Sequence, residues 1–349
     1  MLAFDKLASK GDALAMIDHV SISDKTNLVN LAKQLFQELK ELSYDGTGIS
    51  RETYGQTETK AMKIFENHAK SFGFGTHWDE AKNLIIRHQG QDPSCSRVAT
   101  GSHLDSVPQG GNFDGAAGVV AGFLALIEAK EKQTLRSVDL IILRGEESAW
   151  FGGPCYFGSR AIFGQLTPFD LECRHRTTHI TLREQMFKAG VDLSVIEQGQ
   201  PLKTSENLFC WLELHIEQGP VLVRRKMPVG IVTGIRGNVR HRRIKMFGEA
   251  GHSGAVPRWL RHDCVFAMSE LINRLDNHWR TLLEQGHDLV LTAGVVGTNP
   301  DEHAVSRIPG YVEFALEYRS QDLDTLEAFG ELLHEEIAQI TAKRSIRFE

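Results

Sequence analysis

The sequence lacks the features that would place it in several protein classes. Its five cysteines are odd in number and scattered without a Cys-x-x-Cys pair, so we expect reduced thiols and a cytoplasmic protein. No segment approaches the ~20 consecutive apolar residues of a membrane span. Residues 1–20 intersperse charged with apolar side chains, unlike a secretory signal. The net charge of −6 provides no positive field to attract nucleic acid or anionic lipid.

The first part of the chain has the pattern of an α/β domain. The composition is ordinary for a globular protein, and 349 residues are enough for two domains. Apolar periodicity predicts helices at 27–42, 57–72 and 114–132, and strands at 83–87, 97–100, 138–143 and 208–212. The last two strands are rich in consecutive apolar residues, which is typical of burial on both faces. This alternation predicts a mostly parallel sheet with flanking helices.

The pattern changes after Pro220. Strands are predicted at 229–232, 241–247, 289–296 and 311–318, and helices at 263–285 and 323–340. Few strands with two amphipathic helices indicate a small α+β domain whose helices cover one face of its sheet. We therefore place the domain boundary between residues 219 and 220.

Polar residues that could carry chemistry follow three of the strands predicted in the first domain. His103 and Asp105 follow the strand at 97–100, Glu146 and Glu147 follow the strand at 138–143, and His215 follows the strand at 208–212. Ligands of parallel α/β sheets bind at the carboxyl ends of the strands, so these positions suit a functional site. Asp105 is placed to hold the His103 ring in one tautomer.

Each of these groups also has an ordinary structural explanation. His103 and Asp105 are compatible with a loop and a turn, and Asp114, at a helix start, with an N-cap. The two glutamates are compatible with a solvated strand end. His215 is compatible with a hydrogen-bonded core histidine.

Together these residues favour a two-metal hydrolase site. Two histidines supply imidazole ligands, and the carboxylate of Asp114 can bridge two cations. The adjacent carboxylates of Glu146 and Glu147 repel each other unless a cation lies beside them. One of them can then bind metal while its neighbour takes a proton from an activated water.

The motifs around these residues resemble those of a known family, the hydantoinase/carbamoylase-type amidases. These are dinuclear metal amidohydrolases that include N-carbamoyl-L-amino-acid hydrolases, β-ureidopropionases and allantoate amidohydrolases. The resemblance extends from about residue 50 to about residue 320. The matching runs are Gly101-Ser102-His103-Leu104-Asp105-Ser106-Val107-Pro108, Gly110-Gly111-Asn112-Phe113-Asp114-Gly115, Glu146-Glu147-Ser148, Gly158-Ser159-Arg160-Ala161, Glu213-Leu214-His215-Ile216-Glu217-Gln218-Gly219-Pro220, Gly248-Glu249-Ala250-Gly251-His252-Ser253-Gly254 and Ile308-Pro309-Gly310.

The resemblance implies a role for each metal-site residue. His103, Asp114 and His215 match the ligands of one metal ion, and Asp114 bridges to a second ion that Glu147 also binds. Glu146 matches the general base. Zinc is the expected ion, with manganese, cobalt or nickel as alternatives.

The resemblance also implies how substrate is held. Gln218 matches a residue beside the substrate, and Arg319 matches an arginine that binds the substrate carboxylate, for which a bidentate contact is well suited. Ser306 stands where the family has an asparagine that touches substrate. His252, in the smaller domain, matches a histidine that reaches the partner subunit's site and stabilises the oxyanion. The implied assembly is therefore a homodimer formed through the smaller domain.

The chain departs from the family pattern in three places. Ser306-Arg307 replaces Asn-Val, and Ala149-Trp150 replaces Arg-Phe, which affects the identity of the substrate. The third departure concerns the end of the chain. The family chain returns to its catalytic domain in a later segment with a Gly-His-Asp run, whose histidine completes the second metal site, and this sequence has no such run at the corresponding place.

We interpret Gly286-His287-Asp288 as a helix end and loop instead of that run. The expected organisation is a zinc exopeptidase-like catalytic domain at 1–219, a dimerisation or lid domain at 220–334, and a truncated returning piece at about 335–349. A truncated member, or one whose last segment lies elsewhere, would have an incomplete second metal site and weak or absent hydrolysis.

The resulting hypothesis is a metal-dependent amidohydrolase. It would cleave a carbamoyl or ureido C–N bond of a small substrate that bears a carboxylate, such as an N-carbamoyl-L-amino acid. Two alternatives stay open. One is a related dinuclear metallopeptidase or deacylase on the same fold, and the other is a catalytically impaired homologue that acts only as a dimerising or binding protein.

Overall fold

The computed structural model describes residues 25–349, so the prediction made for residues 1–20 lies outside the described residues. The chain divides into two units, Met1–Lys226 and Met227–Glu349. This division falls a few residues after the predicted boundary at 219–220. No helix within residues 25–349 has both the length and the apolar character that crossing a bilayer requires.

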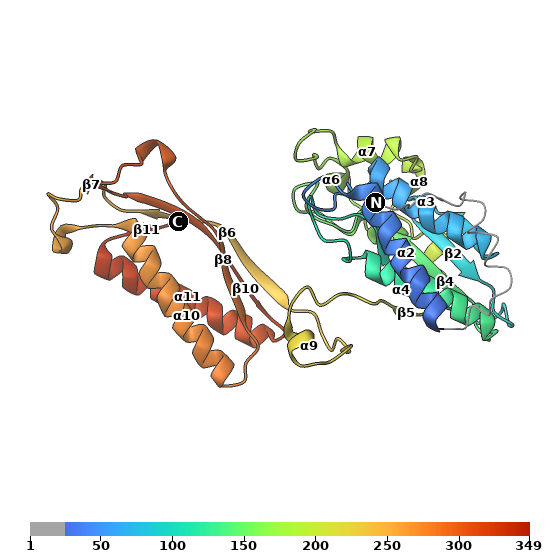
Figure 1. The fold of residues 1–349 in the computed structure, drawn as a ribbon. Coiled ribbons are helices and arrows are strands. Elements are labelled where there is room, and N and C mark those ends of the chain that lie inside the picture. Colours follow the sequence, from blue (N-terminus) through green and yellow to red (C-terminus); the bar gives the residue numbers. More distant parts are fainter. Residues whose placement is uncertain (1–24) are drawn as a thin grey trace, which may run out of the picture. The chain divides into compact units, whose positions relative to one another are not determined.

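A five-stranded sheet with the order β1-β2-β4-β3-β5 forms the centre of the first unit (Figure 1). Its strands are β1 (Gly75–Trp78), β2 (Leu84–His88), β3 (Arg97–His103), β4 (Val138–Leu143) and β5 (Leu208–Leu212). β3 pairs in parallel with both β4 and β5, whereas β2 is antiparallel to both of its neighbours. All strands except β2 therefore run in one direction, which confirms the predicted mostly parallel sheet.

Helices cover both faces of this sheet because successive strand residues point to opposite sides. Leu140 and Ile142 of β4 belong to the core beneath α2 (Lys25–Ser43), α3 (Gln56–Ser71) and α4 (Ala116–Glu131). Ile141, between them, packs on the other face with Ile162 of α5 (Phe157–Ile162). The apolar run in β4 thus serves two cores at once, as predicted.

Three short helices that the apolar periodicity did not predict follow α5. They are α6 (Pro168–Leu171), α7 (Leu182–Lys188) and α8 (Leu193–Ile196), and they enclose an apolar cluster of their own. Thr167 with Asp170, and Thr181 with Glu184, form capping boxes at the starts of α6 and α7. A Thr followed three residues later by an acidic residue is a readable helix start, so a signal for these helices was present.

Burial on both faces, which we predicted for 208–212, is wrong. In the part of the chain that the structure describes, β5 is one of the two edge strands and pairs with β3 alone. Phe209 and Leu212 are 61% and 62% exposed. An edge position leaves these side chains uncovered although the apolar run resembles that of β4.

The second unit is a four-stranded antiparallel sheet with two long helices on one face (Figure 1). The sheet order is β11-β6-β10-β8, with β6 (Gly237–Phe247), β8 (Val290–Thr298), β10 (Tyr311–Ser320) and β11 (Arg347–Phe348). The helices are α10 (Cys264–Glu284) and α11 (Leu323–Arg344). Their apolar sides share one core with the sheet. A separate ribbon pairs β7 (Gly251–His252) with β9 (Arg307–Ile308).

Two predictions for this part of the chain need correction. Residues 229–232 form no strand in the described structure, and Ile231 is 94% exposed, because this apolar segment has no neighbouring strand or helix to cover it. Residues 335–349 do not return to the first unit. They continue α11 and form β11, which pairs with β6, and Ile340 and Ile346 are buried in the core of the second unit.

Candidate active site

His103 occupies the end of β3 and is almost completely buried. Its Nδ1 lies 3.0 Å from the carbonyl oxygen of Asp105 and 3.2 Å from Oδ1 of the same residue. Its Nε2 lies 3.6 Å from Oε2 of Glu146. Burial lowers the pKa of His103, but Asp105 and the two glutamates outweigh it and raise the pKa to about 9. The carboxylates around His103 therefore favour positive charge in their vicinity.

Asp105 connects the two strand ends. Its buried carboxylate accepts hydrogen bonds from the hydroxyl of Thr53 at 2.7 Å and from the backbone N–H groups of Glu146 at 3.1 Å and Glu147 at 3.0 Å. Burial acts to raise the pKa of Asp105, but His103 and these donors keep it below its usual value. One carboxylate thus orients a histidine after β3 and a pair of glutamates after β4.

The two glutamates lie half-buried beyond the end of β4. Burial raises the pKa of Glu147 to about 7; His103 opposes this shift, and the nearby Asp105 and Glu146 carboxylates add to it. Burial also raises the pKa of Glu146, again against the effect of His103. The repulsion expected from the sequence is therefore present, and a cation beside these groups would relieve it.

Asp114 lies immediately before α4, but in the described structure the helix has Gly115 at its N-cap and no side-chain cap. One carboxylate oxygen of Asp114, Oδ2, accepts a hydrogen bond of 2.6 Å from the Gln218 amide. The other, Oδ1, is buried and has no hydrogen-bond partner among residues 25–349. Nε2 of His215 lies 3.6 Å from this oxygen. The Asp114 side chain therefore does not cap the helix, and the N-cap explanation is wrong.

Gly115 keeps space open beside His103. Its φ of +62° is in the left-handed region that favours glycine. A Cβ at this position would lie 2.5 Å from the carbonyl oxygen of His103 and 2.6 Å from its Nε2. Only glycine leaves the ring nitrogen of His103 unobstructed at the start of α4.

His215 and Gln218 lie in the segment after β5. The side chain of His215 is 48% exposed, so it is not the core histidine of the structural alternative. Its Nδ1 lies 2.6 Å from the carbonyl oxygen of Ile216, which directs Nε2 toward Asp114. Glu217 instead accepts the N–H groups of Val221 and Leu222, at the start of α9 (Val221–Arg224).

The residues present suit a divalent metal ion in their chemistry. Within residues 25–349, no three His, Cys, Asp or Glu side chains are grouped closely enough to hold an ion. However, both candidate histidines engage Nδ1 with a carbonyl oxygen, which leaves Nε2 available as a ligand. The buried Oδ1 of Asp114 lacks a partner, and imidazole nitrogens with carboxylate oxygens are ligands that zinc accepts.

The remaining candidates belong to the second unit. β7 and β9 pair so that His252 faces Arg307, and the N–H of Ser253 donates to the carbonyl oxygen of Ser306 at 2.8 Å. His252 and Ser306 are thus neighbours in the ribbon. Arg319 lies on β10 and donates to the carboxylate of Glu317 at 2.9 Å.

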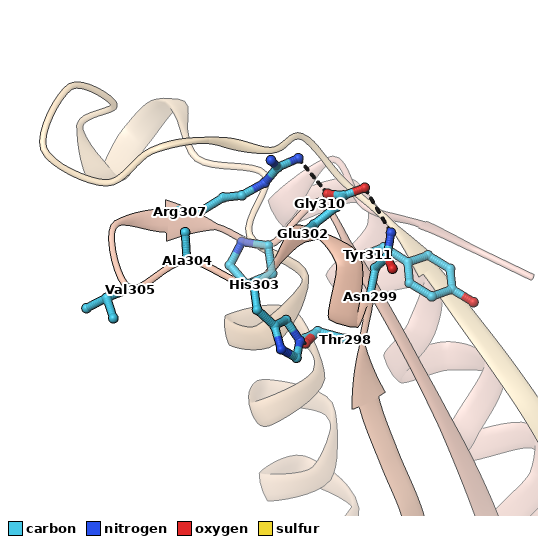
Figure 2. A pocket seen from close by; sticks show the side chains of 10 residues that line it. Thr298, Asn299, Glu302, His303, Ala304, Val305, Arg307, Gly310 and Tyr311 are labelled. Carbon is cyan, nitrogen blue, oxygen red and sulfur yellow. Dashed lines mark hydrogen bonds and ion pairs between the residues drawn. The ribbon is translucent and has the colours of Figure 1, made fainter.

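A cavity of about 410 Å³ lies beside this ribbon, between the end of β8 and the start of β10 (Figure 2). The Glu302 carboxylate lies between two other lining residues. It accepts hydrogen bonds from Arg307 at 2.5 Å and from Asn299 at 3.0 Å. His303 contacts the Thr298 hydroxyl at 2.6 Å. The positive charge that Arg307 adds beside Ser306 is thus paired with Glu302, a contact that the sequence did not predict.

The predicted run Gly286-His287-Asp288 contributes nothing to a metal site in the described structure. Gly286 follows the end of α10 with a φ of +89°, and Asp288 forms an ion pair of 2.6 Å with Arg236. His287 lies 3.4 Å from the Thr325 hydroxyl. The interpretation as a helix end and loop is confirmed.

Comparisons with known proteins find a peptidase family model and a group of amidohydrolases. The model of peptidase family M28 matches residues 83–182. The chain is 33% identical to the N-carbamoyl-L-amino acid amidohydrolase of Geobacillus stearothermophilus, over 90% of this chain and 76% of that protein. It is 32% identical to the allantoate amidohydrolase of Bacillus subtilis, over 87% of this chain and 72% of that protein. A crystal structure of a hydantoinase/carbamoylase family amidase from Burkholderia ambifaria matches with a TM-score of 0.77 and 26% identity, over 91% of this chain and 76% of that one.

Proposed function

This chain belongs to the hydantoinase/carbamoylase family of amidases, and on that premise we propose that it is a metal-dependent amidohydrolase that cleaves the C–N bond of a carbamoyl or ureido group near a carboxylate. The observation that carries the proposal is the Asp105 carboxylate, which holds His103 and the backbone of Glu146 and Glu147 together at the ends of two parallel strands. The names of the relatives, which act on N-carbamoyl-L-amino acids and allantoate, support the substrate class.

In this proposal His103, Asp114 and His215 hold one divalent ion, and Asp114 and Glu147 contribute to a second. Zinc is the expected ion because the donors are imidazole nitrogens and carboxylate oxygens. Ions bound there supply Lewis-acid polarisation of the substrate carbonyl and make a water easier to ionise. Asp105 fixes the ring of His103 so that Nε2 is the ligand atom.

Glu146 is the proposed general base. Its carboxylate lies beside Nε2 of His103, and its raised pKa brings it closer to the pH at which a carboxylate both accepts and returns a proton effectively. It takes the proton from the attacking water and delivers it to the leaving nitrogen. For an N-carbamoyl substrate the products are an amino acid, ammonia and carbon dioxide.

The second unit is proposed to complete the site of a partner subunit. His252 would stabilise the oxyanion, Arg319 would bind the substrate carboxylate, and Ser306 would contact the rest of the substrate. Gln218, of the first unit, would contact substrate beside the metal ligands of its own subunit. For Arg319 this requires sharing or displacing Glu317, which it contacts in the described structure. The assembly proposed is a homodimer formed through the second unit, in the cytoplasm.

A related peptidase or deacylase is the second candidate, and it is favoured by the match of residues 83–182 to peptidase family M28. A panel of an N-carbamoyl-L-amino acid, allantoate, an N-acetyl-amino acid and a dipeptide, assayed with added zinc or manganese, separates the two. Ammonia release from the carbamoyl or ureido compounds, abolished in Glu146→Gln, supports the proposal.

Cleavage of the acetyl compound or the dipeptide in preference would favour the second candidate. Zinc binding without turnover of any compound would contradict both and would favour a binding protein.

A further inference from the structure

Arg144 is a buried cation at the end of β4. It directly precedes Gly145-Glu146-Glu147, and its side chain is 1% exposed. The guanidinium donates to Oε2 of Glu58 through Nε at 2.9 Å and Nη2 at 2.7 Å, and to the Thr59 hydroxyl at 2.8 Å. It also lies over the ring of Tyr54, 4.7 Å from the centroid. A guanidinium in the protein interior requires such partners.

Glu58, in the first turn of α3, is fully buried and connects Arg144 to the backbone. Its Oε1 accepts the N–H of Gly145 at 3.0 Å, and its Oε2 also accepts the N–H of Tyr54 at 2.7 Å. Gly145 has a φ of +61°, and a Cβ there would lie 2.8 Å from the Thr53 side chain. The chain therefore turns tightly at Gly145 while Glu58 holds its amide.

Three consecutive amides are thus held by two buried carboxylates. Glu58 accepts the N–H of Gly145, and Asp105 accepts those of Glu146 and Glu147. Replacing a buried ion pair by well-packed apolar side chains of similar volume is often neutral or stabilising. Stability alone is therefore a weak reason for burying Glu58 and Arg144 here, next to the two glutamates.

We propose that Glu58 and Arg144 are positioning residues for Glu146 and Glu147: Arg144 keeps Glu58 in place, and Glu58 fixes the turn that directs the two glutamates into the site. This inference rests on the proposed function for its effect on the reaction. Neither residue is proposed to touch substrate or metal. Both act through the backbone of Gly145.

The test uses the double variant Glu58→Leu/Arg144→Met, which removes both charges at similar volume and avoids leaving one charge unpaired. The control is Asp139→Leu/Arg87→Met/Arg97→Met. Asp139 is a buried carboxylate at the other end of β4, paired at 2.6 Å with both Arg87 and Arg97. The control removes a buried carboxylate of the same strand together with both of its arginines, without touching the turn.

Hydrogen exchange of the amides of residues 145–147 reports the position of the turn without requiring activity. We expect exchange there to become about tenfold faster or more in the test variant, because the Gly145 amide loses its acceptor, and to stay unchanged in the control. In active protein, kcat should fall ~10–100-fold with little change in KM, and zinc affinity should weaken, at a melting temperature matching the control.

Unchanged exchange at 145–147, or losses of kcat and zinc affinity no larger than in the control, would overturn the positioning role. A failure of the proposed function would be distinguishable from a failure of the positioning role. It would appear as an absence of both zinc binding and ammonia release in the wild-type protein. Hydrogen exchange at residues 145–147 would then still decide whether Glu58 and Arg144 fix the turn.

Discussion

Asp105→Asn is the substitution that most directly perturbs the organisation of the site. The carboxylate is buried and surrounded by donors: the Thr53 hydroxyl, the N–H groups of Glu146 and Glu147, and Nδ1 of His103. Asparagine has almost the same shape but replaces one acceptor oxygen with an NH2 group. In either orientation of the amide, that NH2 group faces at least one backbone N–H group that then lacks an acceptor.

The expected size of the effect follows from these contacts. A buried donor without an acceptor costs ~1–3 kcal/mol of unfolding free energy. Loss of the negative charge also weakens the hold on the His103 ring, because Nδ1 then keeps only the backbone carbonyl oxygen of residue 105 as a strong acceptor. Residues that orient metal-binding histidines typically contribute 10–100-fold to metal affinity, so zinc affinity should fall by ~10–100-fold, or ~1.4–2.8 kcal/mol.

Zinc affinity measured by chelator competition, together with urea unfolding, tests this prediction. Asp79→Asn is the matched control, because Asp79 is also buried and accepts from the Asn83 N–H at 2.8 Å and from the Thr204 hydroxyl at 3.2 Å. The control should lose stability but keep its zinc affinity. If Asp105→Asn binds zinc as well as the control does, Asp105 does not organise a metal site.

Three further predictions concern the proposed base, the shared site and an ion-pair cluster of the second unit. Glu146→Gln should lower turnover by ~10² or more while metal content stays the same, and near-normal turnover would refute Glu146 as the base. Mixing His252→Ala with Glu146→Gln subunits should restore part of the activity, because one site of a mixed dimer keeps both residues; no restoration in mixtures shown to exchange subunits contradicts a shared site. Lys343, with Arg344 and Arg274, holds the pKa of Glu270 at about 2, below its usual 4.5, so Glu270 stabilises the fold above about pH 4.5 and this stabilisation is lost as the pH falls toward 2. Urea unfolding of Glu270→Gln should therefore show a deficit at pH 7 that vanishes at low pH, and a deficit independent of pH would contradict this.

The sequence predicted the first unit well where apolar runs coincide with burial. The bounds of β4 agree with the prediction because the strand has neighbours on both edges and helices on both faces. The similar run in β5 misled the burial prediction, since edge position depends on which strands pair, and pairing is not encoded in the run itself. Residues 335–349 were misplaced because the family resemblance implied a piece returning to the catalytic domain, whereas α11 continues to Arg344 and β11 pairs with β6.

The candidate site was predictable to the extent that its residues follow strands. His103 and Glu146 approach each other because β3 and β4 are adjacent and parallel, which the α/β pattern predicts. The hydrogen bonds that the Asp105 carboxylate accepts from the backbone N–H groups of the two glutamates could not be predicted, because they depend on the register of these strands. Glu58 and Arg144 are 86 positions apart, and only the basic residue directly after an apolar strand hinted at a buried partner.

The measurement that tests the account most directly is zinc content and ammonia release on the same samples of wild-type protein, His103→Ala and His215→Ala. We expect the wild type to retain zinc and to release ammonia from an N-carbamoyl-L-amino acid or allantoate, however slowly, and only with metal present. Both alanine variants should lose zinc and turnover together. Zinc binding that survives both substitutions, or ammonia release that survives them and complete chelation, would contradict the account.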